Sequence, residues 1–172
     1  MKAFDAINRL AEITAYQWGM FTSAQAKRAG IARYTLVRLE NHGQIERLLH
    51  GVYRIAAVPT DEYEELRAIW LKFLPDLYAY ERMEQLATDF VVAGQTAAIL
   101  HEMADYRMDR FEFIHDGRKQ TRQAQAKVRN RSFDTSDVMV VTGLPVTSRE
   151  VTYRDLIDAH EDVSSVRYKV EE

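Results

Sequence analysis

The chain has 172 residues and a mass of 20.0 kDa, enough for one medium domain or two small ones with a real core. Hydrophobic residues make up 47% and charged residues 28%, a composition that excludes a disordered or fibrous chain. The absence of cysteine excludes a disulfide scaffold, a thiolate nucleophile, a Cys-ligated zinc finger and an iron–sulfur cluster. The net charge is −3, yet residues 1–58 hold eight Lys and Arg against four Asp and Glu.

The first third of the chain predicts three helices followed by a hairpin. Apolar residues from Phe4 to Ile13 recur at i, i+3 and i+4 and predict a helix over 4–16. Thr22 or Ser23 can cap a second helix over 24–29, and a third helix over 32–42 follows Gly30. Two short alternating segments, 44–49 and 52–55, predict a hairpin. This order predicts a winged helix-turn-helix over residues 1–58.

The remainder, 59–172, predicts a mixed α/β region, so the fold class is α+β with two parts. Residues 76–85 are ambiguous, and 118–131 are polar and basic. The elements expected here are helices over 62–74 and 95–102, a strand or loop over 91–94, a strand over 111–114, a buried strand over 138–142, an extended segment at 146–147 and a closing helix over 152–159 with Leu156 and Ile157 on its buried side.

The third helix carries the most informative pattern. With Leu36 and Leu39 facing the core, its period places Tyr34, Arg38 and Asn41 on the opposite face, with Arg33 and Thr35 at the N-terminal rim. Arginine pairs with guanine and asparagine with adenine in the major groove, while Tyr or Thr contacts phosphate or a thymine methyl. The pattern therefore predicts a DNA recognition helix.

Two further groups of residues extend this predicted DNA surface. Thr22 and Ser23 offer hydroxyl and amide donors to a phosphate at the start of the second helix. Arg47, His50 and Arg54 lie on the wing, where they are expected to touch the DNA backbone or an adjacent minor groove. An alternative interpretation is an exposed helix with two solvated arginines.

A second basic segment lies within residues 118–131. A solvated loop is one interpretation; a second nucleic-acid surface or a site for an acidic partner is the other. Its basic residues are Arg118, Lys119, Arg122, Lys127, Arg129 and Arg131.

Catalytic and metal motifs find no support in the sequence. No two of the five histidines are spaced as a close His pair, and His101-Glu102 lacks the second His of a zinc site. No phosphate-cradling glycine loop, hydrolase elbow or Glu-x-Lys nuclease motif occurs. We therefore expect no enzyme activity, no metal and no cofactor. No apolar run approaches about 18 residues, and Met1–Leu10 carries charges throughout, so we expect a cytoplasmic protein.

Several motifs resemble the AbiEi-type antitoxins of type IV abortive-infection toxin–antitoxin systems. In the first third these are Trp18–Ser23, Ala29–Ile31 and the wing segment His50–Arg54. Further along, Val91–His101 is similar to the family segment leading into an Ala-rich helix, and Gly143–Ser148 with Thr152 and Arg154–Leu156 to a second family motif.

The resemblance implies a transcriptional autorepressor that binds promoter inverted repeats through its winged helix, with a homodimer on the DNA as one possibility. Family members counter a nucleotidyltransferase-like toxin, typically without a stable complex, and the C-terminal portion is associated with this neutralisation. Members usually continue into a further C-terminal domain, whereas this sequence stops at Glu172. The alternative function is a protein-interaction module whose winged helix and 118–131 segment dock a protein partner.

Overall fold

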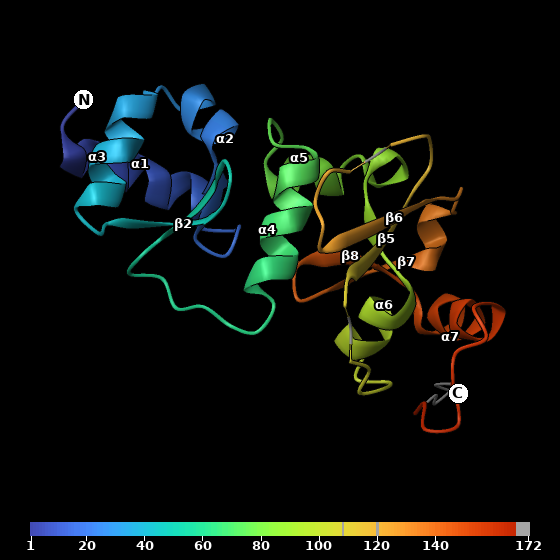
Figure 1. Ribbon diagram of the computed structural model, residues 1–172. Coiled ribbons are helices and arrows are strands. Elements are labelled where there is room, and N and C mark those ends of the chain that lie inside the picture. The colour runs from blue at the N-terminus through green and yellow to red at the C-terminus, as the bar shows by residue number, and fades with distance from the viewer. Residues whose placement is uncertain (108, 120, 168–172) are drawn as a thin grey trace. The chain divides into compact units, whose positions relative to one another are not determined.

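The computed structural model describes residues 1–107, 109–119 and 121–167. It divides into two compact units, Met1–Glu84 (unit 1) and Gln85–Glu172 (unit 2), each of which combines helices with its own sheet (Figure 1). The chain is therefore α+β, as its sequence predicts.

Unit 1 begins with a winged helix-turn-helix. Its strands form an antiparallel sheet in the order β1-β3-β2, with Phe21 beside Tyr53 and Arg47 on the other side of Tyr53. Leu10, Phe21 and Leu36 meet in its core. The elements are α1 (Ala3–Thr14), β1 (Met20–Thr22), α2 (Ser23–Arg28), α3 (Arg33–Asn41), β2 (Ile45–Leu49) and β3 (Val52–Ile55).

Two local features of this region differ from the sequence prediction. The side chain of Phe4 is 73% exposed, because α1 buries the stripe of Ala6, Leu10 and Thr14 instead. The strand β1 was not predicted, since three residues are too few to show an alternating pattern.

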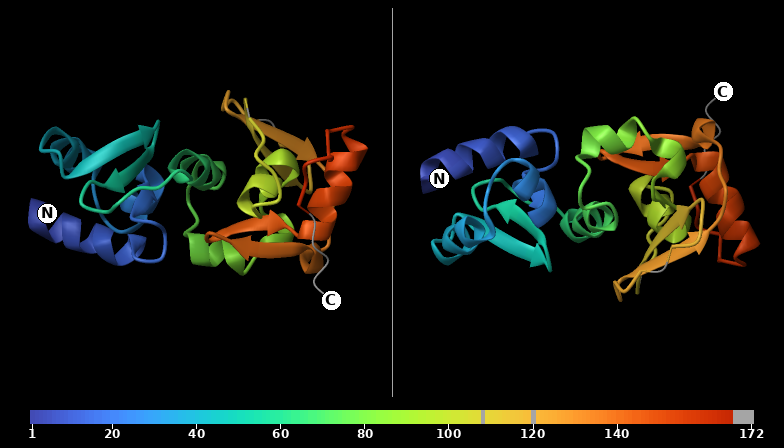
Figure 2. Two further views of the ribbon diagram at one scale, coloured as in Figure 1. Left: turned by 90° about the horizontal axis from the view of Figure 1, so that it is seen from below. Right: turned by 90° about the horizontal axis from the view of Figure 1, so that it is seen from above.

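Unit 1 continues past the predicted boundary at residue 58. Helix α4 (Glu64–Phe73) packs on all three strands of the sheet (Figure 2). Its Trp70 is completely buried. The rings of Trp18 and Trp70 meet edge to face at 6.0 Å, and the guanidinium of Arg67 lies 5.0 Å from the centre of the Trp18 ring. Because α4 covers the sheet of unit 1, this unit extends beyond residue 58 and ends at Glu84.

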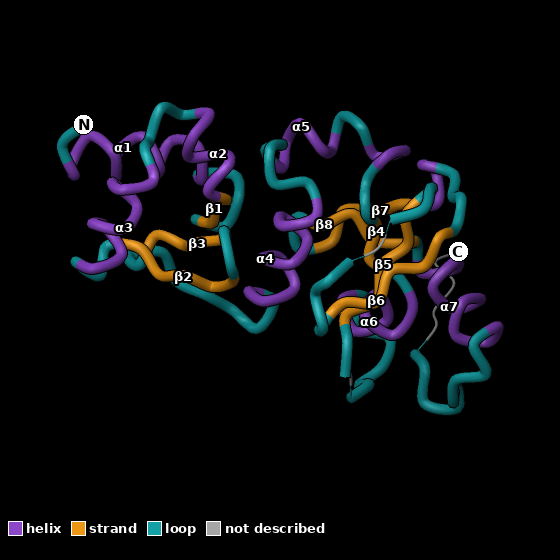
Figure 3. The backbone as a smooth tube through the Cα atoms, turned by 45° about the horizontal axis from the view of Figure 1, so that its top comes forward, coloured by secondary structure: helices purple, strands orange, loops and turns teal. Residues whose placement is uncertain are grey.

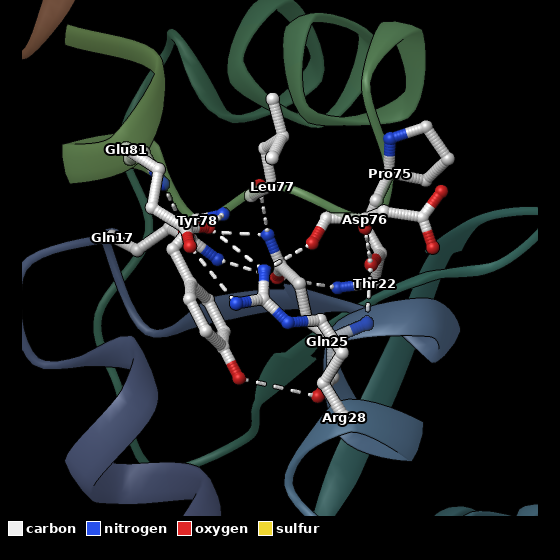
Figure 4. Close-up of polar contacts among 10 residues, drawn as sticks. Gln17, Thr22, Gln25, Arg28, Pro75, Asp76, Leu77, Tyr78 and Glu81 are labelled. Atoms are coloured by element: carbon white, nitrogen blue, oxygen red, sulfur yellow. Dashed lines mark hydrogen bonds and ion pairs between the residues drawn. The ribbon is translucent and has the colours of Figure 1, made fainter. Parts of the chain in front are cut away.

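A polar network holds the segment after α4 against α2 (Figure 4). Gln25 accepts a hydrogen bond from Gln17 at 2.7 Å and donates one to the Leu77 carbonyl at 2.8 Å. Gln17 in turn accepts from the amide of Ala79, the first residue of α5 (Ala79–Met83), at 2.8 Å. Gln17, Gln25 and Ala79 are buried and Leu77 is half-buried, so the network fixes the 75–81 segment to the winged helix.

An ion pair lies at the outer side of this network. Arg28 donates to both carboxylate oxygens of Glu81 at 2.8 and 2.9 Å, and its guanidinium lies 4.4 Å from the centre of the Tyr78 ring. The hydrogen bond from Arg28 holds the pKa of Glu81 below its ordinary value.

Unit 2 is built around one five-stranded sheet in the order β6-β5-β4-β8-β7. Strands β4 and β8 are parallel, as are β5 and β6, and the other neighbours are antiparallel. Helix α6 packs on β5, and α7 packs on α6 (Figure 3). The elements are η1 (Leu86–Thr88), β4 (Val91–Val92), α6 (Gly94–Leu100), β5 (Phe111–His115), β6 (Ala126–Asn130), η2 (Thr135–Asp137), β7 (Val138–Val141), β8 (Leu144–Thr147) and α7 (Arg149–Asp158).

Two burial predictions for unit 2 are wrong. Strand β7 is not buried, because it lies at the edge of the sheet and leaves Met139 and Val140 exposed. On α7, Leu156 is buried as predicted and packs with Ala98 of α6, but Ile157 lies outside this cluster and is 47% exposed. Strand β6 falls inside the basic segment, for which no strand was predicted. Within the part of the chain that the structure describes, no helix has the length and apolarity needed to span a membrane.

Candidate nucleic-acid interface

Helix α3 presents a polar face with an apolar centre. It begins after the tight turn at Gly30, whose φ of +76° favours glycine, and it buries Leu36 and Leu39. Arg38 and Asn41 are exposed, as the period predicts, together with Tyr34 at 61% and Val37 at 48%. Sequence reasoning missed Val37, although the same helical period places it between Tyr34 and Asn41.

A groove of about 620 Å³ runs between α2, the near side of α3 and the wing. Three exposed cations line it, namely Lys27, Arg33 and Arg47, with Glu40 as an acidic group among them. Lys27 was not among the predicted contacts, although its place in the last turn of α2 gives it the same outward direction as Ser23 one helical turn earlier. The groove therefore carries net positive charge beside α3.

The wing and the start of α2 contribute polar groups to the same groove. Arg47 Nη2 lies 2.8 Å from His50 Nδ1 in an exposed pair. The hydroxyl of Ser23 is exposed, but its amide donates to the Gly51 carbonyl at 2.9 Å, so only the hydroxyl is available to a phosphate. On the other side of α3, Arg38 lines a separate hollow of about 410 Å³ with Ala3 and Gln44.

Three residues predicted to contact DNA are buried inside the fold, namely Thr22, Thr35 and Arg54. Thr22 is 1% exposed, because its hydroxyl accepts from the Gln25 amide in a capping box and donates to the Pro75 carbonyl at 2.5 Å. Thr35 is also 1% exposed, since its position on α3 points it inward with Leu36.

Arg54, which was predicted to contact DNA from the wing, is also buried. It is 6% exposed and donates to Glu64 at 2.6 Å and to Glu46 at 2.7 Å, and it also donates to the carbonyls of Ile55 and Val58. Its charge is therefore neutralised within unit 1 and is not displayed on the wing.

The second basic segment is divided by the structure. Arg118, Lys119, Arg122 and Lys127 are exposed. Arg129 instead lies 3.7 Å from the Glu112 carboxylate, and Arg131 donates to Asp155 at 2.5 Å. The predicted surface of six cations is therefore reduced to four, because two of them face acidic partners within unit 2.

Groups that hold metals do not gather in the described residues, where no cluster of three or more His, Asp or Glu side chains has the arrangement of a metal site. His101 caps the end of α6, and its Nε2 lies 2.7 Å from the Thr147 carbonyl oxygen. Burial lowers the pKa of this imidazole.

The residues of α2, α3 and the wing lie within a segment that matches a known protein family. Residues 8–56, which include α2, α3 and the wing, match the family model described as "Transcriptional regulator, AbiEi antitoxin". This segment is AbiEi-like. The match confirms the resemblance predicted from Trp18–Ser23 and His50–Arg54. The motifs at Val91–His101 and Gly143–Ser148 lie outside the matched residues and remain predictions.

Among solved structures, the crystal structure of the RV2827C protein from Mycobacterium tuberculosis is similar to this chain, with a TM-score of 0.53 and 18% sequence identity. The similarity covers 88% of this chain and 60% of that one, so this chain spans less than two thirds of the length of the solved protein. At this identity the likeness concerns the fold alone. No curated protein shows significant sequence similarity to this chain.

Proposed function

We propose that the chain is a DNA-binding transcriptional autorepressor and the antitoxin of a type IV toxin–antitoxin system. It acts in the cytoplasm as a regulator and not as an enzyme, and it binds inverted repeats in its own promoter. The observation that carries the proposal is the exposed face of α3, which lies beside a groove lined by cations within the AbiEi-like segment.

The residues of α3 suit base recognition. A helix fits the major groove of B-DNA, where Arg reads guanine O6 and N7 and Asn reads adenine N6 and N7. Arg38 and Asn41 hold these groups on the exposed face, and Arg33 holds a second guanidinium on the groove side. Tyr34 and Val37 offer apolar surface to a thymine methyl group, the main apolar feature of that groove.

The groove residues suit contacts to the DNA backbone. Lys27 and Arg47 supply charge, and Ser23 and His50 supply hydrogen-bonding groups, all from elements that flank α3. Backbone contacts of this kind set the position of a recognition helix and contribute affinity that depends on salt. The reading surface therefore consists of α3 with the groove, without Thr22, Thr35 and Arg54.

DNA binding is tested with the full chain and a labelled fragment of its own promoter. We expect the promoter to bind at least about a thousandfold more tightly than a scrambled duplex at one salt concentration. The double variant Arg33→Ala/Arg38→Ala should lose this preference, whereas the matched control Arg118→Ala/Arg122→Ala should keep it. Equal affinity for promoter and scrambled DNA would contradict the proposal, and salt-insensitive binding to a protein instead would favour the interaction-module alternative.

The antitoxin role requires a separate test. If a neighbouring gene encodes a nucleotidyltransferase-like toxin, its expression should arrest growth, and co-expression of this chain should restore it. Because the family relationship implies neutralisation without a stable complex, the two proteins should not copurify. The Arg33→Ala/Arg38→Ala variant should still restore growth, since that role is associated with the C-terminal portion in the family. Failure of the wild-type chain to restore growth would leave a DNA-binding regulator without antitoxin activity.

A further inference from the structure

The two edges of the unit 2 sheet differ in chemistry. At one edge, β6 carries Lys127 and Arg129, and charged side chains are a common device by which proteins prevent an edge from pairing with another strand. At the other edge, β7 has the sequence Val-Met-Val-Val, without a charge, a proline or a glycine. Only the β6 edge is protected in this way.

The exposure of β7 shows that this edge faces solvent. Among the described strands β7 pairs with β8 alone, in an unbroken antiparallel register from Val138 beside Thr147 to Val141 beside Leu144. Its neighbour β8 is buried throughout, whereas Met139 is 45% and Val140 62% exposed. Because consecutive residues of a strand point to opposite faces, each face of β7 has one exposed apolar side chain at its centre.

We propose that β7 is a self-association edge, which pairs antiparallel with β7 of a second copy of this chain. The backbone N–H and C=O groups on its outer side can be satisfied by an extended strand, and Met139 and Val140 would gain apolar neighbours from it. The two five-stranded sheets would then form one continuous sheet across a two-fold axis.

The charge pattern around β7 favours a second copy as the occupant. The acidic residues Asp134 and Asp137 precede the strand, whereas Thr142 and Gly143 follow it. With Val140 of one copy opposite Val140 of the other at the two-fold axis, antiparallel pairing places Asp137 of one copy opposite Gly143 of the other. The acidic ends therefore stay apart and only uncharged side chains meet along the strand, so this strand is complementary to itself.

The pairing goes beyond the proposed function and can be tested without DNA. If both hold, each dimer would carry two winged helices, which is the number that an inverted repeat requires. If the chain does not bind its promoter, the β7 pairing still makes the same prediction for the protein alone, so the two failures can be told apart.

Sedimentation of the full chain over a range of concentrations tests the pairing. The wild type should form a dimer, and Val140→Lys should weaken dimerisation by about tenfold or more, because two lysines meet beside the axis. Met139→Lys, on the opposite face, should do the same, whereas the matched control Lys127→Ser at the β6 edge should leave dimerisation unchanged. Circular dichroism confirms that the variants fold. A wild type that is monomeric at every concentration, or a dimer that neither lysine weakens, overturns the proposal.

The absence of cysteine allows the dimer geometry to be measured directly. A spin label on Ser136→Cys, just before β7, has a partner only in the second copy. Strand geometry places the two labels about 20–30 Å apart. Val140→Lys should abolish this dipolar signal. A short distance between labels on Lys127→Cys, without one on Ser136→Cys, would assign the contact to the β6 edge and overturn the proposal.

Discussion

The α3–wing region and the 118–131 segment are both rich in Lys and Arg in the sequence, but the structure arranges their cations differently. Around α3, exposed Lys27, Arg33 and Arg47 converge on one groove, and Arg54 alone is drawn inside. In the second region, Arg129 and Arg131 face acidic partners in unit 2, and the four exposed cations lie in a loop and at a strand edge.

The comparison shows that the number of Lys and Arg residues in a segment does not determine how much positive charge the segment exposes to a ligand such as DNA. An arginine that is held by buried or half-buried carboxylates contributes to the stability of its own unit, whereas an exposed one can release counterions on binding a phosphate.

Arg54→Met should destabilise unit 1. The substitution leaves the Glu64 carboxylate half-buried without its partner, and removing one member of a buried pair costs about 3–5 kcal/mol. Because Glu46 is half exposed, we expect the lower end, about 3 kcal/mol in urea denaturation. Arg47→Met on the exposed wing is the matched control and should change stability by less than about 0.5 kcal/mol. Similarly small changes in the free energy of unfolding for both variants would contradict a stabilising role for the ion pairs of Arg54.

Arg38→Lys should weaken promoter binding while retaining the charge. Lysine cannot reproduce the bidentate contact of a guanidinium with guanine, so we expect a loss of about 1–3 kcal/mol on the promoter. Binding to a scrambled duplex should hardly change. Titrations of both duplexes at one salt concentration measure the difference, and an equal loss on the two would assign Arg38 to the backbone. Arg122→Lys, in the second basic segment, should alter neither.

Arg131→Gln should destabilise unit 2. It removes the donor that lies 2.5 Å from Asp155, whose side chain is 8% exposed, so a buried carboxylate loses its partner. Leaving such a group unsatisfied costs about 1–3 kcal/mol. We expect the lower half of this range, because Arg131 is itself one third exposed. Arg118→Gln provides the exposed control. A free energy of unfolding equal to that of the wild type would contradict a structural role for Arg131 and would group it with the exposed cations of the segment.

Glu81→Gln should have the smallest effect, and one that depends on pH. The folded-state pKa of Glu81 is lowered, so its contribution to stability is full above the ordinary pKa of a glutamate and is lost as the pH falls through the lowered value. Arg28 is 40% exposed, so we expect no more than about 1 kcal/mol near neutral pH. Urea titrations from neutral to acidic pH should show the wild type and the variant converging. A constant difference would exclude the Arg28–Glu81 pair as its source.

Much of the candidate DNA-binding surface could be predicted because it depends on local periodicity. Leu36 and Leu39 determine which side of α3 is buried, and the exposure of Tyr34, Arg38 and Asn41 follows. The same helical period places Thr35 on the buried side of α3. The Thr22-x-x-Gln25 spacing is a capping-box signature, which predicts that the Thr22 hydroxyl is already hydrogen-bonded within the protein. Those two errors were avoidable from the sequence.

The position of Arg54 could not be predicted in this way. Its partner Glu64 lies on α4, and no local pattern shows that α4 folds back over β3. The same holds for the boundary of unit 1, which depends on the contacts of Gln25 and Gln17 with residues 77 and 79. In unit 2, an apolar run such as Val138–Val141 predicts a buried strand, whereas its position at an edge is set by the order of all five strands.

The edge-to-face pair of Trp18 and Trp70 has a practical consequence for spectroscopy. These are the two tryptophans of the chain, and both belong to unit 1. Fluorescence excited at the red edge of indole absorption therefore reports on the environment of unit 1, whereas far-ultraviolet circular dichroism records both units. A mismatch between the two transitions in one sample would show that the units unfold separately, without any label or truncation.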